Sequence, residues 1–174
     1  MQTNDNCSSS RSIKVFIMNT FFIIVNTNNG DIMKENIEFL NYIYKTSKLS
    51  LIELQEIKPN IQDKEILSII KKYEEKYFVI CTKATEQLLA LKKEPDYISA
   101  ISRIATSIES RISTMNDQSN TNIAKTIITS NNQTMINLKK HINNYHGKST
   151  KVLKLSNELL RTINCSLNSL KKYL

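Results

Sequence analysis

The histidines of this chain are the first residues to weigh for metal or acid–base chemistry. His141 and His146 are five residues apart, so they do not share a helical face as an i, i+4 pair would. No Asp or Glu lies within ten residues of either histidine. A zinc site or a Glu-x-x-His di-metal motif needs such neighbours. The sequence therefore predicts no metal centre.

The three cysteines give an equally weak signal for chemistry. Cys7, Cys81 and Cys165 are far apart and form no C-x-x-C pair. An odd number of thiols without ligand spacing argues against a disulfide framework and against a zinc site. Cys81 falls beside an apolar helical stripe, so we expect a small core residue there. This cysteine usage favours a reducing, intracellular compartment.

Motifs for nucleophilic catalysis and phosphate binding are also missing from the sequence. There is no G-x-S-x-G elbow, and the chain has only two glycines, which excludes glycine-rich phosphate loops. The carboxylate pairs Glu35/Glu38 and Glu74/Glu75 stand among lysines on faces that we expect to be solvated. We therefore predict a protein that is not an enzyme, with no cofactor and no small-molecule substrate.

The most specific chemical feature is a basic C-terminal half. Residues 95–174 hold 11 basic and four acidic side chains, whereas residues 31–94 hold 11 of each. At 100° per residue, Lys154, Arg161 and Lys172 project in nearly the same direction. A basic face of this kind predicts salt-sensitive binding of nucleic acid. The predicted face comprises Lys139, Lys140, Lys151, Lys154, Arg161, Lys171 and Lys172.

Two other interpretations of this basic face stay open. The lysines can be an ordinary solvated surface that keeps the protein soluble. A basic amphipathic helix at the C-terminus can also lie on an anionic membrane surface, although this helix has no Trp or Phe to anchor it.

The elements that position these residues are helices. Two Gly and two Pro in 174 residues are too few for a turn-rich sheet protein, and the length fits one domain. The longest amphipathic pattern covers 61–94, with apolar residues at spacings of three and four, and Pro95 ends it. A helix of this length needs other helices to cover its apolar face.

Turn and capping signals divide the chain before this helix. Asn28-Asn29-Gly30 predicts a turn, after which Asp31 begins a helix that reaches about Lys45. Residues 46–48 predict a break. A capping box formed by Ser50 and Glu53 then opens a short helix over 51–57, and the turn 58–60 follows it.

After Pro95, Asp96 is predicted to cap a helix whose apolar seam runs from Ile98 to Met115. The polar stretch 116–132 is either a loop near 116–122 or the weak part of one long helix. The pattern resumes at 135–145, where His146-Gly147 predicts a C-terminal cap, and Ser149 or Thr150 opens a last helix. The predicted fold is all-α: an antiparallel helical bundle or coiled-coil-rich hairpin of four to five helices.

The N-terminal residues 1–30 are predicted to be an extension preceding a helical domain over 31–174. Within the extension, the run IKVFIMNTFFIIV at 13–25 is the most hydrophobic in the chain. Its β-branched and aromatic residues suit a short packed strand or core segment. Alternatively, the run is a secretion signal or membrane-surface anchor, or an extension of little consequence; it is too short to span a bilayer.

The leading functional hypothesis is a non-enzymatic helical interaction or scaffold protein. The apolar stripes are narrow and resemble the a/d seams of helices that zip together. We expect them to pair with one another and with helices of a protein partner, either a second copy or another protein. The predicted partner-helix seam comprises Ile66, Ile70, Tyr73, Tyr77, Ile80, Ile101, Ile108, Ile112, Leu155 and Leu159. Nucleic-acid binding and a secreted or membrane-associated helical protein are the alternatives.

Overall fold

The predicted all-α antiparallel bundle is confirmed by the structure. The computed structural model describes the backbone of residues 8–96, 99–115 and 117–174, and the side chains of 30–96, 101–115 and 117–174. These residues form helices and the loops between them, with no strand among them. The elements are α1 (Ser8–Ile57), the 3-10 turn η1 (Lys58–Asn60), α2 (Lys64–Ala90), α3 (Ser99–Ser113), α4 (Asn120–Asn143), α5 (Thr150–Leu170) and the 3-10 turn η2 (Lys171–Tyr173).

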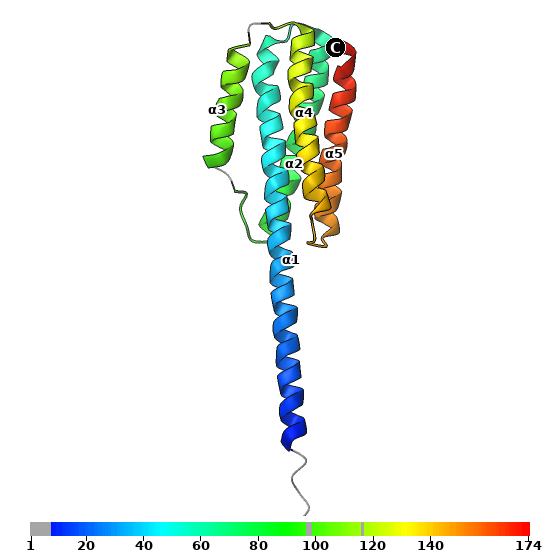
Figure 1. Ribbon diagram of the computed structural model, residues 1–174. Helices are drawn as coiled ribbons and strands as arrows, with labels where there is room; N and C mark the ends of the chain where they lie inside the picture. Colours follow the sequence, from blue (N-terminus) through cyan, green and yellow to red (C-terminus); the bar gives the residue numbers. More distant parts are fainter. Residues whose placement is uncertain (1–7, 97–98, 116) are drawn as a thin grey trace, which may run out of the picture.

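Four helices make the bundle, and α1 is longer than the bundle itself. The C-terminal half of α1 packs with α2, α4 and α5, and α1 and α2 run antiparallel, as do α4 and α5 (Figure 1). The shorter α3 stands at the side and packs on α1. The N-terminal half of α1 projects past the ends of the other helices (Figure 1).

The boundaries predicted along this segment are wrong, because α1 runs without a break from Ser8 to Ile57. It passes through the predicted helix start at Asp31 and the predicted end near Lys45. The 13–25 run is helical and not a strand. The predicted turn at 28–30 lies inside the helix, where Gly30 does not adopt a positive φ. The break at 46–48 and the separate helix at 51–57 are absent too. Ser50 and Glu53 are buried within α1 and do not form a cap, because packing on other helices overrides weak local propensity.

The long helix α2 is shorter at both ends than the predicted 61–94. It begins after Asp63, whose carboxylate accepts hydrogen bonds from the backbone N–H groups of Glu65 and Ile66 at 2.8 and 2.9 Å. At the other end, Lys92 adopts a φ of 57° and its N–H donates to the Leu89 carbonyl. The Lys93 N–H donates to the Leu88 carbonyl, which completes a Schellman motif and ends the helix before Pro95.

The second half of the chain follows the prediction more closely. Ile98 lies outside the described residues, and α3 ends at Ser113. A loop separates α3 from α4, so the two are not one continuous helix, and Ser119 caps the start of α4. The predicted cap at His146-Gly147 is wrong, because α4 ends at Asn143. Ser149 caps α5 as predicted, with its hydroxyl accepting from the Val152 N–H at 3.4 Å.

The hydrophobic core lies where the four bundle helices meet. The largest fully buried side chains come from α1, α2 and α4, and α5 adds a stripe of leucines and isoleucine. Close packing of such side chains supplies most of the stability of a helical bundle. The core residues include Leu40, Ile43, Ile57, Ile66, Ile70, Tyr73, Tyr77, Ile80, Leu88, Ile123, Ile127, Leu138, Leu155, Leu159, Ile163 and Leu170.

Candidate functional sites

The predicted partner-helix seam lies inside the chain's own core. Nine of its ten side chains are at most 5% exposed, and Ile108 is half-buried. The nine are Ile66, Ile70, Tyr73, Tyr77, Ile80, Ile101, Ile112, Leu155 and Leu159. Helices of the same chain therefore cover the seam in this structure.

Hydrogen bonds of the seam tyrosines reinforce this intramolecular role. The hydroxyl of Tyr73 lies 3.0 Å from the Ser169 Oγ of α5. The hydroxyl of Tyr77 donates to the Asn131 Oδ1 of α4 at 3.3 Å, and Asn131 Nδ2 donates to the Ser166 Oγ at 3.2 Å. Burial raises the pKa of Tyr77, so this hydroxyl stays a neutral donor. A partner would have to contact another surface of the protein.

The predicted basic face is spread along two helices and a turn. Its residues are Lys139 and Lys140 on α4, Lys151, Lys154 and Arg161 on α5, and Lys171 and Lys172 in η2, and all seven are exposed. The structure brings Lys154 and Arg161 together in the lining of one groove, which the other five do not line. Lys172 forms an ion pair with Glu65 of α2, so its charge is balanced.

The groove that holds Lys154 and Arg161 runs between α2 and α5 and has a volume of about 630 Å³. Lys72 and Lys76 of α2 line it from the opposite side, which the sequence analysis missed. The spacing of four residues between Lys72 and Lys76 places both on one helical face, and this spacing could have been recognised in the sequence. The remaining lining residues are Glu75, Val79, Glu158, Thr162 and Cys165.

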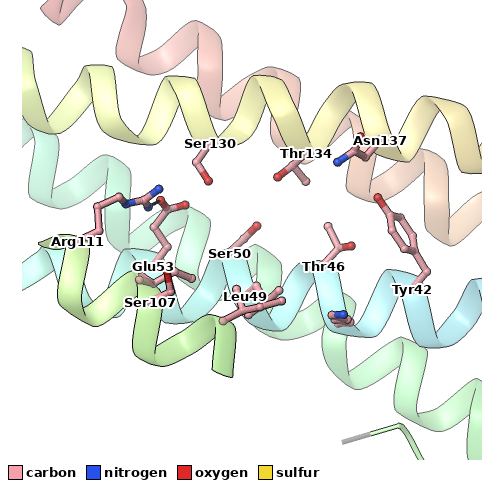
Figure 2. A pocket seen from close by; sticks show the side chains of 13 residues that line it. Tyr42, Thr46, Leu49, Ser50, Glu53, Ser107, Arg111, Ser130, Thr134 and Asn137 are labelled. Atoms are coloured by element: carbon pink, nitrogen blue, oxygen red, sulfur yellow. Dashed lines mark hydrogen bonds and ion pairs between the residues drawn. The ribbon is translucent and has the colours of Figure 1, made fainter. Parts of the chain in front are cut away.

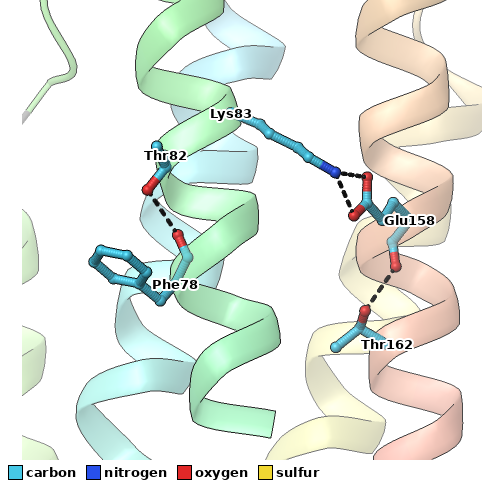
Figure 3. Close-up of polar contacts among 5 residues, drawn as sticks. All are labelled: Phe78, Thr82, Lys83, Glu158 and Thr162. Carbon is cyan, nitrogen blue, oxygen red and sulfur yellow. Dashed lines mark hydrogen bonds and ion pairs between the residues drawn. The ribbon is translucent and has the colours of Figure 1, made fainter. Parts of the chain in front are cut away.

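A charged contact ties the two walls of this groove together. Lys83 Nζ of α2 donates to both carboxylate oxygens of Glu158 of α5, at 2.8 and 2.9 Å (Figure 3). The Thr162 hydroxyl donates to the backbone carbonyl of Glu158 at 2.9 Å, one turn along α5. Lys83 thus balances one of the two carboxylates in the lining, which leaves the groove with an excess of positive charge.

A second cleft, of about 380 Å³, opens between α1, α3 and α4. Figure 2 shows polar side chains of α1 facing polar side chains of α4 across it. Its lining residues are Tyr42, Lys45, Thr46, Leu49, Ser50 and Glu53 of α1, Ile104, Ser107, Ile108 and Arg111 of α3, and Ser130, Thr134 and Asn137 of α4. This cleft was not predicted from the sequence, because residues 46–48 were expected to be a break and Ser50 and Glu53 a capping box.

Glu53 is the buried ionisable group of this cleft. Its side chain is 5% exposed and forms an ion pair with the Arg111 guanidinium of α3. The pKa of Glu53 is raised because burial disfavours the carboxylate. Hydrogen bonds from Ser130 and Arg111, together with the charge of Arg111, oppose this shift. Glu53 therefore joins α1 to both α3 and α4.

The two histidines lie in different surroundings and do not form a pair. The His141 ring is 3.6 Å from the Tyr42 ring and 6.1 Å from the Phe39 ring, centroid to centroid. Partial burial lowers the pKa of His141. The backbone N–H of His146 donates to the Glu35 carboxylate at 2.8 Å. In the described part of the chain, no three His, Cys, Asp or Glu side chains gather as a metal site would require.

The predicted carboxylate pairs have separate structural contacts. Glu35 holds the loop before α5 through His146, and Glu38 lies 3.9 Å from Lys34 on the surface. Glu74 is less exposed than predicted, at 13% of its side chain, because Lys58 Nζ of η1 binds it at 2.7 Å. The contacts of Glu35 and Glu74 attach a loop and a turn to helices, whereas the Glu38–Lys34 contact lies within α1.

The cysteines within the described side chains differ in exposure. Cys81 is buried, as predicted, and burial raises the pKa of its thiol to about 11. Cys165 is exposed at the edge of the groove between α2 and α5. Cys7 lies outside the described residues.

The projecting part of α1 contains the apolar run 13–25, in which ten of 13 residues are apolar. Over the described residues, none of the helices combines the length and the apolar character that crossing a membrane requires. Comparison with known proteins adds no functional information: no family model, curated protein or solved structure matches this chain.

Proposed function

We propose that this chain is a non-enzymatic helical interaction protein that joins a protein assembly through the projecting part of α1. The observation that carries this proposal is the place of the most apolar sequence of the chain, 13–25, on a helix that extends past the bundle (Figure 1). A helix whose sequence is apolar on all sides is stable only when something covers it. Partner helices can provide this cover.

The burial of the predicted partner-helix seam also supports the projecting part of α1 as the interaction surface. Because the seam side chains pack on helices of their own chain, they offer no apolar face to a partner. The projecting part of α1 lies beyond the ends of α2, α4 and α5 (Figure 1). Pairing of this segment with other helices is therefore the form of the scaffold hypothesis that the fold supports best.

The test is size-exclusion chromatography with light scattering on the full chain, at about 100 mM and about 500 mM salt. We expect a salt-independent assembly, because apolar contacts are not screened. A triple variant, Ile17→Asp, Phe21→Asp and Ile24→Asp, places charges on one face of the projecting helix and should give a monomer. The matched control, Phe78→Asp with Leu89→Asp, changes two exposed apolar residues of the bundle and should leave the assembly intact.

Two outcomes would contradict this proposal. One is a wild-type monomer that captures no protein through the projecting segment. The other is binding of the wild-type chain, but not of the triple variant, to vesicles of anionic lipid without any protein assembly. That second result would favour a membrane-surface anchor instead.

A second candidate function, nucleic-acid binding, is favoured by the groove between α2 and α5. Lys72 and Lys76 face Lys154 and Arg161 there, and Lys83 balances Glu158. Four cations on two adjacent helices can contact successive phosphates of one strand, which releases counterions and makes binding salt-sensitive. We expect the affinity to fall about tenfold or more between about 100 mM and about 300 mM salt.

Fluorescence anisotropy with labelled single-stranded and double-stranded oligonucleotides tests this candidate. The variants Lys72→Glu with Lys76→Glu, and Lys154→Glu with Arg161→Glu, should each abolish the binding. The control Lys139→Glu with Lys140→Glu makes the same change in charge on exposed residues outside the groove. Equal loss in the control would show that net charge, and not the groove, determines the binding.

A further inference from the structure

We propose that the cleft between α1, α3 and α4 binds a small polyhydroxylated molecule of the sugar or cyclic polyol class. This inference is independent of the projecting part of α1 and of the groove between α2 and α5. It departs from the sequence-based expectation that no small molecule is bound. The cleft volume of about 380 Å³ falls in the range of about 300–1,000 Å³ that is typical of ligand pockets.

A stripe of polar residues lines the cleft, at positions where a helical bundle normally buries apolar side chains. On α1, polar residues of the lining follow one another at positions 42, 46, 50 and 53, which is the spacing of one helical face. On α4, polar lining residues at 130, 134 and 137 form the matching stripe. Figure 2 shows the hydroxyls of Ser50 and Ser130 pointing into the space between the two helices.

Some of these polar groups have hydrogen-bond partners within the protein: Thr46 bonds to Tyr42, and Ser50 bonds to Tyr77 of α2. Glu53 is bonded by Ser130 and Arg111. Ser50 is 8% exposed and Glu53 is 4% exposed, so part of the stripe is in the interior, where polar groups cost free energy unless they find such partners. The other polar groups of the lining have hydrogen-bonding capacity that a ligand can use.

The mixture of groups in the cleft determines the class of ligand. Glu53 accepts hydrogen bonds, Arg111 and Lys45 donate them, and the hydroxyl and amide side chains do both. The Glu53–Arg111 pair balances its own charge, so the cleft is not strongly charged in either sign. Hydroxyl groups of a neutral ligand can satisfy both donors and acceptors, whereas a strongly charged ligand would leave one kind unpaired.

The apolar part of the lining fits the same class. Leu49 of α1 and Ile104 and Ile108 of α3 line the cleft beside the polar stripes, and the ring of Tyr42 lies at one end (Figure 2). The C–H faces of a sugar or polyol ring can pack on such side chains while its hydroxyls reach the polar stripes. A bound sugar or polyol would therefore contact both the polar and the apolar side chains of the cleft.

Saturation-transfer NMR on the full chain, with glucose and myo-inositol as the probes, tests this proposal. We expect transfer to the ring protons of at least one probe. Thr134→Val removes one lining hydroxyl without changing the shape of the side chain, and should weaken binding by about threefold to tenfold. The control Thr129→Val makes the same change on the exposed side of α4 and should bind like the wild type.

Three results would overturn the proposal. The first is the absence of saturation transfer to both probes in a folded wild-type sample. The second is equal binding by the wild type and Thr134→Val, because it would place the probe elsewhere. The third is displacement of a bound probe by inorganic phosphate at the same concentration, because it would identify an anion site. Circular dichroism of both variants confirms that the helices are intact.

Discussion

Glu53 of α1 and Arg111 of α3 form an ion pair in which solvent reaches only one partner. The arginine side chain is 51% exposed, whereas the glutamate side chain is 5% exposed. The cost of removing the carboxylate from water is therefore only partly offset by a cation that stays hydrated. The ionisation of Glu53 should therefore affect the attachment of α3 to α1.

The stability of the protein should depend on pH through Glu53. Burial raises the pKa of this carboxyl above its usual 4.5, so the folded state binds the proton more tightly than the unfolded state. The stability contributed by this proton is complete below pH 4.5 and is lost as the pH rises through the folded-state pKa. Glu53→Gln cannot titrate. The unfolding free energy of this variant should therefore rise relative to that of the wild type over that pH range.

Urea unfolding of the two proteins at several pH values measures this difference. Carboxyls with a lowered pKa, such as that of Asp63, change stability in the opposite sense, but they do so in both proteins and cancel in the comparison. A difference between the two free energies that stays constant with pH would contradict the prediction.

Removal of the arginine should be more harmful than removal of the charge on the glutamate. Arg111→Met leaves the Glu53 carboxylate buried without its cation. Of the groups that lower the pKa of Glu53, only the hydrogen-bond donor Ser130 then remains. We expect a loss of about 1–3 kcal/mol at neutral pH, less than for a fully buried pair because Arg111 is half exposed. Denaturant unfolding measures it, and Glu53→Gln added to Arg111→Met should restore part of the loss.

The core and the surface should respond differently to the same substitution. Leu159 of α5 is fully buried in the core, whereas Leu89 of α2 is 54% exposed. Leu159→Ala leaves a cavity and should lower the unfolding free energy by about 2–5 kcal/mol. Leu89→Ala should change it by less than about 0.5 kcal/mol. Equal effects in thermal or urea unfolding would mean that α5 does not pack on the bundle as described.

The cysteines should differ in their reactivity toward iodoacetamide. Cys165 is exposed, so it should be alkylated quickly in the folded protein at about pH 8. Cys81 is buried and its thiol pKa is about 11, so it should react only when the protein unfolds. Mass spectrometry of the peptides after timed labelling, with and without denaturant, distinguishes the two sites. Rapid labelling of Cys81 in the native protein would contradict its place in the core.

Helix content and most of the core could be predicted from the sequence alone. The spacing of apolar residues in 66–88 and 152–170 places each set on one face, and these faces are buried in the structure. One cap was also predicted correctly: Ser149 begins α5 through a local hydrogen bond. The caps Asp63 of α2 and Ser119 of α4 were not predicted. Local signals failed where distant contacts outweighed them: Ser50 and Glu53 resemble a capping box, but packing keeps them inside α1.

The meeting of distant residues was decided by the tertiary structure. Glu53 and Arg111 are 58 positions apart, and no spacing rule relates them. Lys72 and Lys76 join Lys154 and Arg161 only because α2 packs beside α5. Helical periodicity is a local property that determines which residues share a face. Which faces then meet depends on the packing of whole helices and on the loops that connect them, so the clefts and charged grooves appear only in the folded chain.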